Sequence, residues 1–187
     1  MTMKPARKHT EIILAGSGGQ GLILSGILLA EAATLEGRNV VQTQSYGIAS
    51  RGGLSLAEVI VDDDEIVYPQ VRRPDCVLAL SEEAATRFQG WAAKGVPVLY
   101  DSTIVAPRSG ENLIGLAFTQ CASDLGSAGS VNILALATVA ERTGVVRPAS
   151  LEQLVRKKFS GAALELNLKM LAAGSELATS GAAPAVA

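Results

Sequence analysis

The chain has 187 residues and a mass of 19.3 kDa, which suits one domain with a sizeable hydrophobic core. Hydrophobic residues make up 48% of the chain and charged residues 18%; the net charge is −2 and the lysines and arginines are scattered, so nothing indicates nucleic-acid binding. No apolar run approaches the ~20 residues of a membrane span, and the basic N-terminus lacks a signal-peptide core, so we expect a cytoplasmic protein without a membrane partner.

The cysteine and histidine content excludes several kinds of catalytic centre. Cys76 and Cys121 each lie in or beside an apolar segment, which predicts buried free thiols in a reducing compartment. His9 is the single histidine, so the chain cannot assemble an ordinary Cys/His metal site, an iron–sulfur cluster or a Ser-His-Asp triad. Any redox chemistry must therefore belong to another chain.

The segment EIILAGSGGQGLILSG, residues 11–26, predicts a strand, a tight turn and a buried helix. The strand runs from Glu11 to Ala15, and the apolar helix runs from Leu22 to about Leu35. The turn between them has free backbone N–H groups at a helix N-terminus, an arrangement that can hold an anion such as phosphate. The turn contains Gly16, Gly18, Gly19, Gln20 and Gly21, and its glycine spacing satisfies the dinucleotide-binding pattern.

The next strand argues against taking that pattern at face value. A Rossmann NAD site has an acid at the end of the second strand, but Val40–Gln44 runs into Ser45 and Tyr46 with no acid. Glu36 comes before the strand, and no lysine follows the turn, which also excludes a nucleoside-triphosphate P-loop. Three interpretations of the turn stay open: an NAD(P) site, a different anion contact, or a purely structural turn.

The loop SYGIASRGG, residues 45–53, is the second motif. It is too short for the crossover that parallel neighbours require, so the strands 40–44 and 54–61 are antiparallel if they pair, and the sheet is mixed. Arg51, followed by Gly52 and Gly53, suits recognition of a carboxylate or phosphate; the alternative is an internal ion pair with an acid. The Tyr46 ring suits an interface.

The remainder of the chain alternates strands and helices. Strands are predicted at Cys76–Leu80, Val96–Tyr100 and Leu113–Phe118. Helices are predicted at Glu82–Gln89 with Ser81 as its cap, at Val131–Arg142 ending at Gly144, at Leu151–Phe159 with a capping box from Ser150 and Gln153, and at Ala162–Ala173 stopped by Gly174.

This order predicts an α/β fold, a three-layer α/β/α sandwich with a mixed, mainly parallel sheet and a Rossmann-like start. We expect a flexible N-terminus over residues 1–9, a single domain over residues 10–174 and a disordered tail over residues 175–187. Both motif loops follow strands, and ligands of such sheets bind beyond the carboxyl ends of strands, so the two loops are expected to form one surface.

Together the motifs resemble a known family. GSGGQGLILSG and SYGIASRGG, followed by PDCVLAL and more loosely by SAGSVNILALA to LELNLKML, resemble the gamma subunit of the 2-oxoacid:ferredoxin (acceptor) oxidoreductases, similar to the gamma-type domain of pyruvate/ketoisovalerate oxidoreductases. The resemblance covers roughly residues 10–174. The chain departs from it at Ile48-Ala49-Ser50, where family members often have Pro-Glu or similar.

The resemblance implies a hetero-oligomeric complex that oxidatively decarboxylates a 2-oxoacid to an acyl-CoA with release of CO2, and passes electrons to ferredoxin or to a flavin- or NAD-linked acceptor subunit. It implies that thiamine diphosphate, Mg2+ and iron–sulfur clusters are held mainly by the alpha, beta and delta-type chains, and that this chain completes the assembly near the coenzyme A path without catalytic residues of its own. The carried-over ligand or interface residues are Gly16, Gly18, Gly19, Gln20 and Gly21 in the first motif, and Ser45, Tyr46, Gly47, Arg51, Gly52 and Gly53 in the second.

The alternative function is that of a stand-alone nucleotide-binding or NAD(P)-dependent Rossmann-like protein. The sequence leaves open whether the complex acts on pyruvate, 2-oxoglutarate, a branched-chain or an aryl 2-oxoacid, and whether ferredoxin or NAD is the final acceptor.

Overall fold

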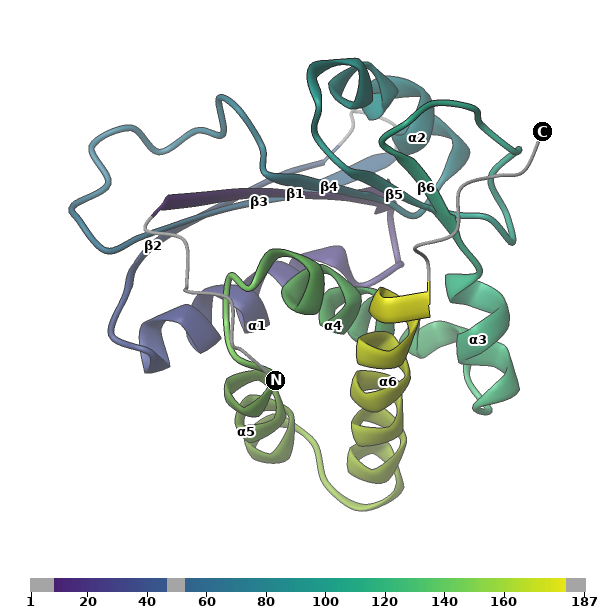
Figure 1. The fold of residues 1–187 in the computed structure, drawn as a ribbon. Helices are drawn as coiled ribbons and strands as arrows, with labels where there is room; N and C mark the ends of the chain where they lie inside the picture. The colour runs from purple at the N-terminus through teal and green to yellow at the C-terminus, as the bar shows by residue number, and fades with distance from the viewer. Residues whose placement is uncertain (1–8, 47–52, 181–187) are drawn as a thin grey trace.

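A computed structural model describes residues 9–46 and 53–180 (Figure 1). Within them, one sheet of six strands has the order β2-β3-β1-β4-β5-β6. The strands are β1 His9–Ser17, β2 Asn39–Tyr46, β3 Leu54–Asp62, β4 Cys76–Ala79, β5 Val98–Asp101 and β6 Leu113–Leu116. The helices are α1 Leu22–Leu35, α2 Glu82–Phe88, α3 Phe118–Asp124, α4 Val131–Thr143, α5 Pro148–Lys158 and α6 Gly161–Ser180, with short 3-10 helices η1 Gln89–Lys94 and η2 Ala128–Ser130.

The sheet is mixed, as predicted. Strand β3 is antiparallel to both of its neighbours, β1 and β2, whereas β1, β4, β5 and β6 are mutually parallel, so three of the five pairings are parallel. The expected antiparallel pairing of the second and third strands is confirmed, with Val40 opposite Val61 and Ser45 opposite Leu56. Because β1 and β2 both run opposite to β3, their carboxyl ends lie at the same edge of the sheet.

Helices cover both faces of the sheet, which confirms the three-layer architecture (Figure 1). The alternation of β1 directs Ile12 and Leu14 into a large core that includes buried residues of α1 and α4, while Ile13 and Ala15 face a smaller core that includes residues of α2 and η1. On the larger side α5 and α6 lie beyond α4, which explains why α4 is apolar on nearly every side. No helix of the described ranges is both long and apolar enough to span a membrane.

Three sequence predictions about the C-terminal helices and the ends of the domain were wrong. Helix α6 continues through Gly174 to Ser180, so residues 175–180 are helical rather than a disordered tail, and residue 9 already belongs to β1. Helix α5 begins at Pro148, two residues before the Ser150 of the predicted capping box, with Arg147 as its N-cap. Proline is favoured in the first helical turn, where its missing N–H costs nothing, so Pro148 was the stronger signal.

Candidate functional site

The glycine-rich turn after β1 is held in shape by the side chain of Gln20. Its Oε1 accepts the Ser17 N–H at 2.6 Å, and its Nε2 donates to the Leu80 carbonyl at the end of β4 at 2.7 Å. A Cβ at Gly16 would lie 2.4 Å from the same Oε1, so the glycine leaves the space that this amide occupies. Gln20 therefore connects the turn to the neighbouring strand, and both ends of its amide are used internally.

Gly21 is the N-cap of α1 and adopts a left-handed conformation with φ 73°. Its carbonyl accepts the Asn132 Nδ2–H at 3.2 Å, and a Cβ on Gly21 would lie 2.6 Å from that nitrogen. Ser25 Oγ lies 3.3 Å from the Asn132 carbonyl, to which it donates. These contacts place the first turn of α4 against the first turn of α1.

The glycine-rich turn contacts the last residue of the second motif at one edge of the sheet. The Gly18 N–H donates to the Gly53 carbonyl at 3.0 Å, and Ser17 lies opposite Leu54 in the β1–β3 register. Ser45 is exposed near the end of β2, and Tyr46 is the last residue of that strand. The predicted residues Gly47, Arg51 and Gly52 lie outside the described part of the chain.

Two helices, α1 and α4, begin at this edge without a side-chain cap. Neither helix has an acidic residue in its first turn. Helix α2, which also starts after a strand of this edge, is self-capped: Ser81 Oγ accepts the Ala84 N–H at 3.2 Å, and Glu82 and Glu83 lie in its first turn. The N–H groups and the dipole of a helix N-terminus favour an anion, so the adjacent N-termini of α1 and α4 suit a phosphate or carboxylate better than a cation.

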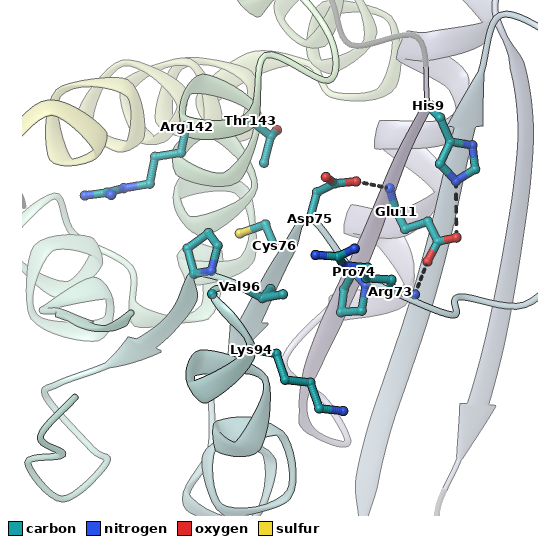
Figure 2. A pocket seen from close by; sticks show the side chains of 12 residues that line it. His9, Glu11, Arg73, Pro74, Asp75, Cys76, Lys94, Val96, Arg142 and Thr143 are labelled. Carbon is teal, nitrogen blue, oxygen red and sulfur yellow. Dashed lines mark hydrogen bonds and ion pairs between the residues drawn. The ribbon is translucent and has the colours of Figure 1, made fainter. Parts of the chain in front are cut away.

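A cavity of about 620 Å3 lies at the opposite edge of the sheet, among the amino ends of β1, β4 and β5 (Figure 2). Its acids are occupied: the Glu11 carboxylate accepts the Arg72 and Arg73 N–H groups at 2.7 and 2.6 Å, and Asp75 accepts the Glu11 N–H at 2.9 Å. Burial raises the pKa of the Cys76 thiol at this cavity to about 12, which keeps it protonated and unreactive. The cavity does not include the motif residues.

Sequence reasoning missed Asn132 and Ser25 as parts of the site. Both are buried polar residues inside otherwise apolar helices, and this combination was the available signal, because a buried polar group needs a partner. Cys76 and Cys121 are both free, as predicted, but the expected burial holds for Cys76 only, because Cys121 is half-buried. With two cysteines in the chain, and no group of three or more potential metal ligands within the described ranges, the donor set does not fit an iron–sulfur cluster.

Comparisons with known proteins place the chain among oxidoreductase subunits. The family model described as pyruvate ferredoxin/flavodoxin oxidoreductase matches residues 11–177. The chain is 39% identical to the 2-oxoglutarate synthase subunit KorC of Archaeoglobus fulgidus over 91% of its own length and 88% of the relative's. It is 32% identical to the ketoisovalerate oxidoreductase subunit VorA of Methanothermobacter marburgensis, covering 93% of its own length but 37% of that longer chain.

The solved structures agree with these matches. The chain superposes on the crystal structure of the keto/oxoacid ferredoxin oxidoreductase gamma subunit from Geobacter sulfurreducens with a TM-score of 0.82 and 35% sequence identity. The alignment covers 94% of this chain and 99% of the Geobacter chain.

Proposed function

The chain belongs to the pyruvate ferredoxin/flavodoxin oxidoreductase family and is a gamma-type subunit of a 2-oxoacid:ferredoxin oxidoreductase. From this premise we propose which substrate its complex uses and what the surface formed by its two sequence motifs does. The substrate is 2-oxoglutarate, because the relative named for that reaction is 39% identical over nearly its whole length, whereas the ketoisovalerate relative is 32% identical and much longer. The motif surface, formed by the glycine-rich turn and the loop after β2, lies on the path of coenzyme A.

The observation that carries this proposal is the bond from the Gly18 N–H to the Gly53 carbonyl, which makes the two motifs one surface. The uncapped N-termini of α1 and α4 face that surface with no acid in their first turns. Coenzyme A carries phosphate groups, and a helix N-terminus favours such groups through its N–H donors and its dipole. Gly18 leaves its side-chain position open, since a Cβ there would meet nothing closer than the Gly53 carbonyl at 3.8 Å.

The chain itself supplies no catalytic group to this proposal. Thiamine diphosphate, when bound with Mg2+, supplies the carbanion chemistry of decarboxylation, and iron–sulfur clusters carry the electrons away. We assign these groups to alpha, beta and delta-type partner chains, because this chain has two cysteines and one histidine. Ferredoxin, or a flavin- or NAD-linked subunit, would receive the electrons from those partners. We also place the chain in the cytoplasm with its partners.

The test is reconstitution. The isolated chain, given 2-oxoglutarate, coenzyme A, thiamine diphosphate and a viologen dye, should reduce no dye, and the partner chains should restore reduction with 2-oxoglutarate above pyruvate. Dye reduction by the isolated chain, or a stoichiometric NAD complex of it, would support the stand-alone alternative instead.

Two variants test the coenzyme A path. Gly18→Ala and Arg51→Ala should raise the KM for coenzyme A in the assembled complex by about tenfold, the effect of losing roughly 1.4 kcal/mol of binding, without lowering the melting temperature of the isolated chain. The matched control is Gly90→Ala. Gly90 lies on η1, away from the motif surface, and an added Cβ there would meet no atom within 4 Å. An unchanged KM in both motif variants would remove coenzyme A from this surface while leaving the subunit assignment in place.

A further inference from the structure

Strand β2 forms one end of the sheet. It pairs with β3 on one side, and no described residue pairs with its other side. Every second backbone N–H and C=O of an edge strand points away from the sheet, and proteins usually guard such edges with lysine, proline or a bulge. The eight residues of β2, NVVQTQSY, include no charge and no proline.

Helix α1 carries an apolar stripe beside this edge. Gly26 faces the sheet, because a Cβ there would contact Ala57 at 3.0 Å and Gln42 of β2 at 3.4 Å. Helical spacing puts Ile23, Ile27 and Ala30 along one line adjacent to Gly26, and all three are only half-buried. The expectation that this helix is buried almost all round therefore does not hold for the chain alone.

We infer that the β2 edge and this stripe, together the β2–α1 flank, bind an extended strand of another subunit of the same oxidoreductase complex. The added strand would pair with the outward-facing backbone groups of β2 and place apolar side chains on Ile23 and Ile27. The inference rests on the proposed function in one respect, namely that the chain works inside a complex with other subunits.

Continuity with the motif surface favours a subunit of the complex as the occupant. Strand β2 leads through Ser45 and Tyr46 into the second motif loop, whose Gly53 carbonyl is bonded to the glycine-rich turn. A strand that is added to β2 therefore runs toward the edge where coenzyme A is proposed to pass. Main-chain pairing would supply affinity, and the apolar stripe on α1 would select a strand with apolar residues on the matching face.

Hydrogen exchange of the intact chain, alone and in the reconstituted complex, tests the pairing directly. In the isolated chain the outward-facing amides of residues 40–45 should exchange quickly, because no residue of the described ranges pairs with them. In the complex every second amide of that segment should exchange more slowly by about tenfold or more, since a backbone hydrogen bond must open before exchange. Side-chain docking without strand pairing would not produce this alternation.

Two flank variants and a matched control test the contribution to assembly. Gln44→Lys places a charge on the exposed end of β2, and Ile27→Lys places one in the α1 stripe. Gln153→Lys makes the same change as Gln44→Lys at an exposed position of α5. Each flank variant should weaken association with the partner chains by about tenfold or more, while the control should leave it unchanged.

Three results would overturn the inference. One is a complex that turns over 2-oxoglutarate while the β2 amides exchange as fast as in the isolated chain; this result would contradict the inference but not the proposed function. Another is alternating protection of β2 in the chain alone, together with a dimer in sedimentation, which makes a second copy the occupant. The third is flank variants that assemble normally. Failure of the wild-type chain to associate with any partner chain would instead refute the proposed function, and with it the premise of this inference.

Discussion

Three glycines of one turn should respond differently to the same substitution. Gly18, Gly19 and Gly21 can each be replaced by alanine, which adds one methyl group. Gly18 has no left-handed φ, and an added Cβ would make only an ordinary contact with the Gly53 carbonyl at 3.8 Å. Gly19 has φ 92° but nothing within 4 Å of an added Cβ. Gly21 has φ 73° and Asn132 Nδ2 at 2.6 Å from an added Cβ. The structure therefore separates backbone strain from steric contact within four residues.

The expected losses of unfolding free energy follow from those environments. Gly18→Ala should stay within about 0.5 kcal/mol of wild type, as for a surface substitution. Gly19→Ala should cost about 1–2 kcal/mol of left-handed strain. Gly21→Ala adds to the same strain the displacement of Asn132 from the Gly21 carbonyl, a further ~1 kcal/mol, for a total of about 2–3 kcal/mol. For a chain of this size each kcal/mol lowers the melting temperature by about 2–4 °C, so Gly21→Ala should lower it by roughly 4–12 °C.

Thermal and urea unfolding of the three variants check this order. Asn132→Ala provides the internal control, because removing that amide clears the space an alanine at position 21 needs. In the Asn132→Ala background, the additional cost of Gly21→Ala should fall to the strain of about 1–2 kcal/mol. The reasoning would be refuted if Gly18→Ala and Gly21→Ala lost equal unfolding free energy. It would also be refuted if Gly21→Ala cost the same in the wild type and in the Asn132→Ala background.

Three further predictions concern Gly174, Gln20 and His9. Gly174→Ala should lower unfolding free energy by about 3 kcal/mol or more or prevent folding, because its Cβ would lie 2.1 Å from the Leu134 carbonyl of the rigid helix α4; Gly90→Ala is the tolerated control. Gln20→Glu should destabilise by about 1–3 kcal/mol, since a carboxylate cannot donate to the Leu80 carbonyl, and an unchanged urea midpoint would refute that role. The hydrogen bond to Asp62 raises the pKa of His9, so the interaction of protonated His9 with Asp62 stabilises the fold at low pH and is lost as pH rises through the folded-state pKa. Between about pH 6 and 8 the melting temperature of the wild type should therefore fall more than that of His9→Gln. Parallel plots of melting temperature against pH for the two proteins would contradict this.

Local signals in the sequence were sufficient for the elements near the site. The glycine-rich turn and the apolar run after it predicted α1 at the observed Leu22–Leu35, because a strand, a tight turn and a helix follow from patterns within a few residues. The nine-residue connection predicted the antiparallel β2–β3 pair for a geometric reason, since no crossover fits into that length. The meeting of the two loops then followed from strand direction alone.

Contacts between distant segments were beyond sequence reasoning. Gly174 was interpreted as a helix stop, yet it lies inside α6 where that helix crosses α4 closely enough for Thr138 Oγ1 to donate to the Gly174 carbonyl at 2.8 Å. A glycine at a helix end and a glycine at a helix crossing look alike in one sequence, because the partner is 36 residues away. The Asn132 contact with Gly21 is hidden for the same reason, spanning 111 positions.

Helix α1 has apolar side chains on a flank that the isolated chain does not fully bury. An isolated domain would gain solubility from polar residues at Ile23 and Ile27, since neither is fully buried and the opposite flank of the helix already packs on α4 and α5. Retaining isoleucine beside an uncharged edge strand exposes apolar side chains and unpaired backbone groups on the same flank, a combination that promotes aggregation in a monomer. Both features become favourable together when a strand with apolar side chains is added to β2. The core of the chain accounts for the fold, and the proposed pairing of β2 with a strand of another subunit would account for the apolar side chains of this flank.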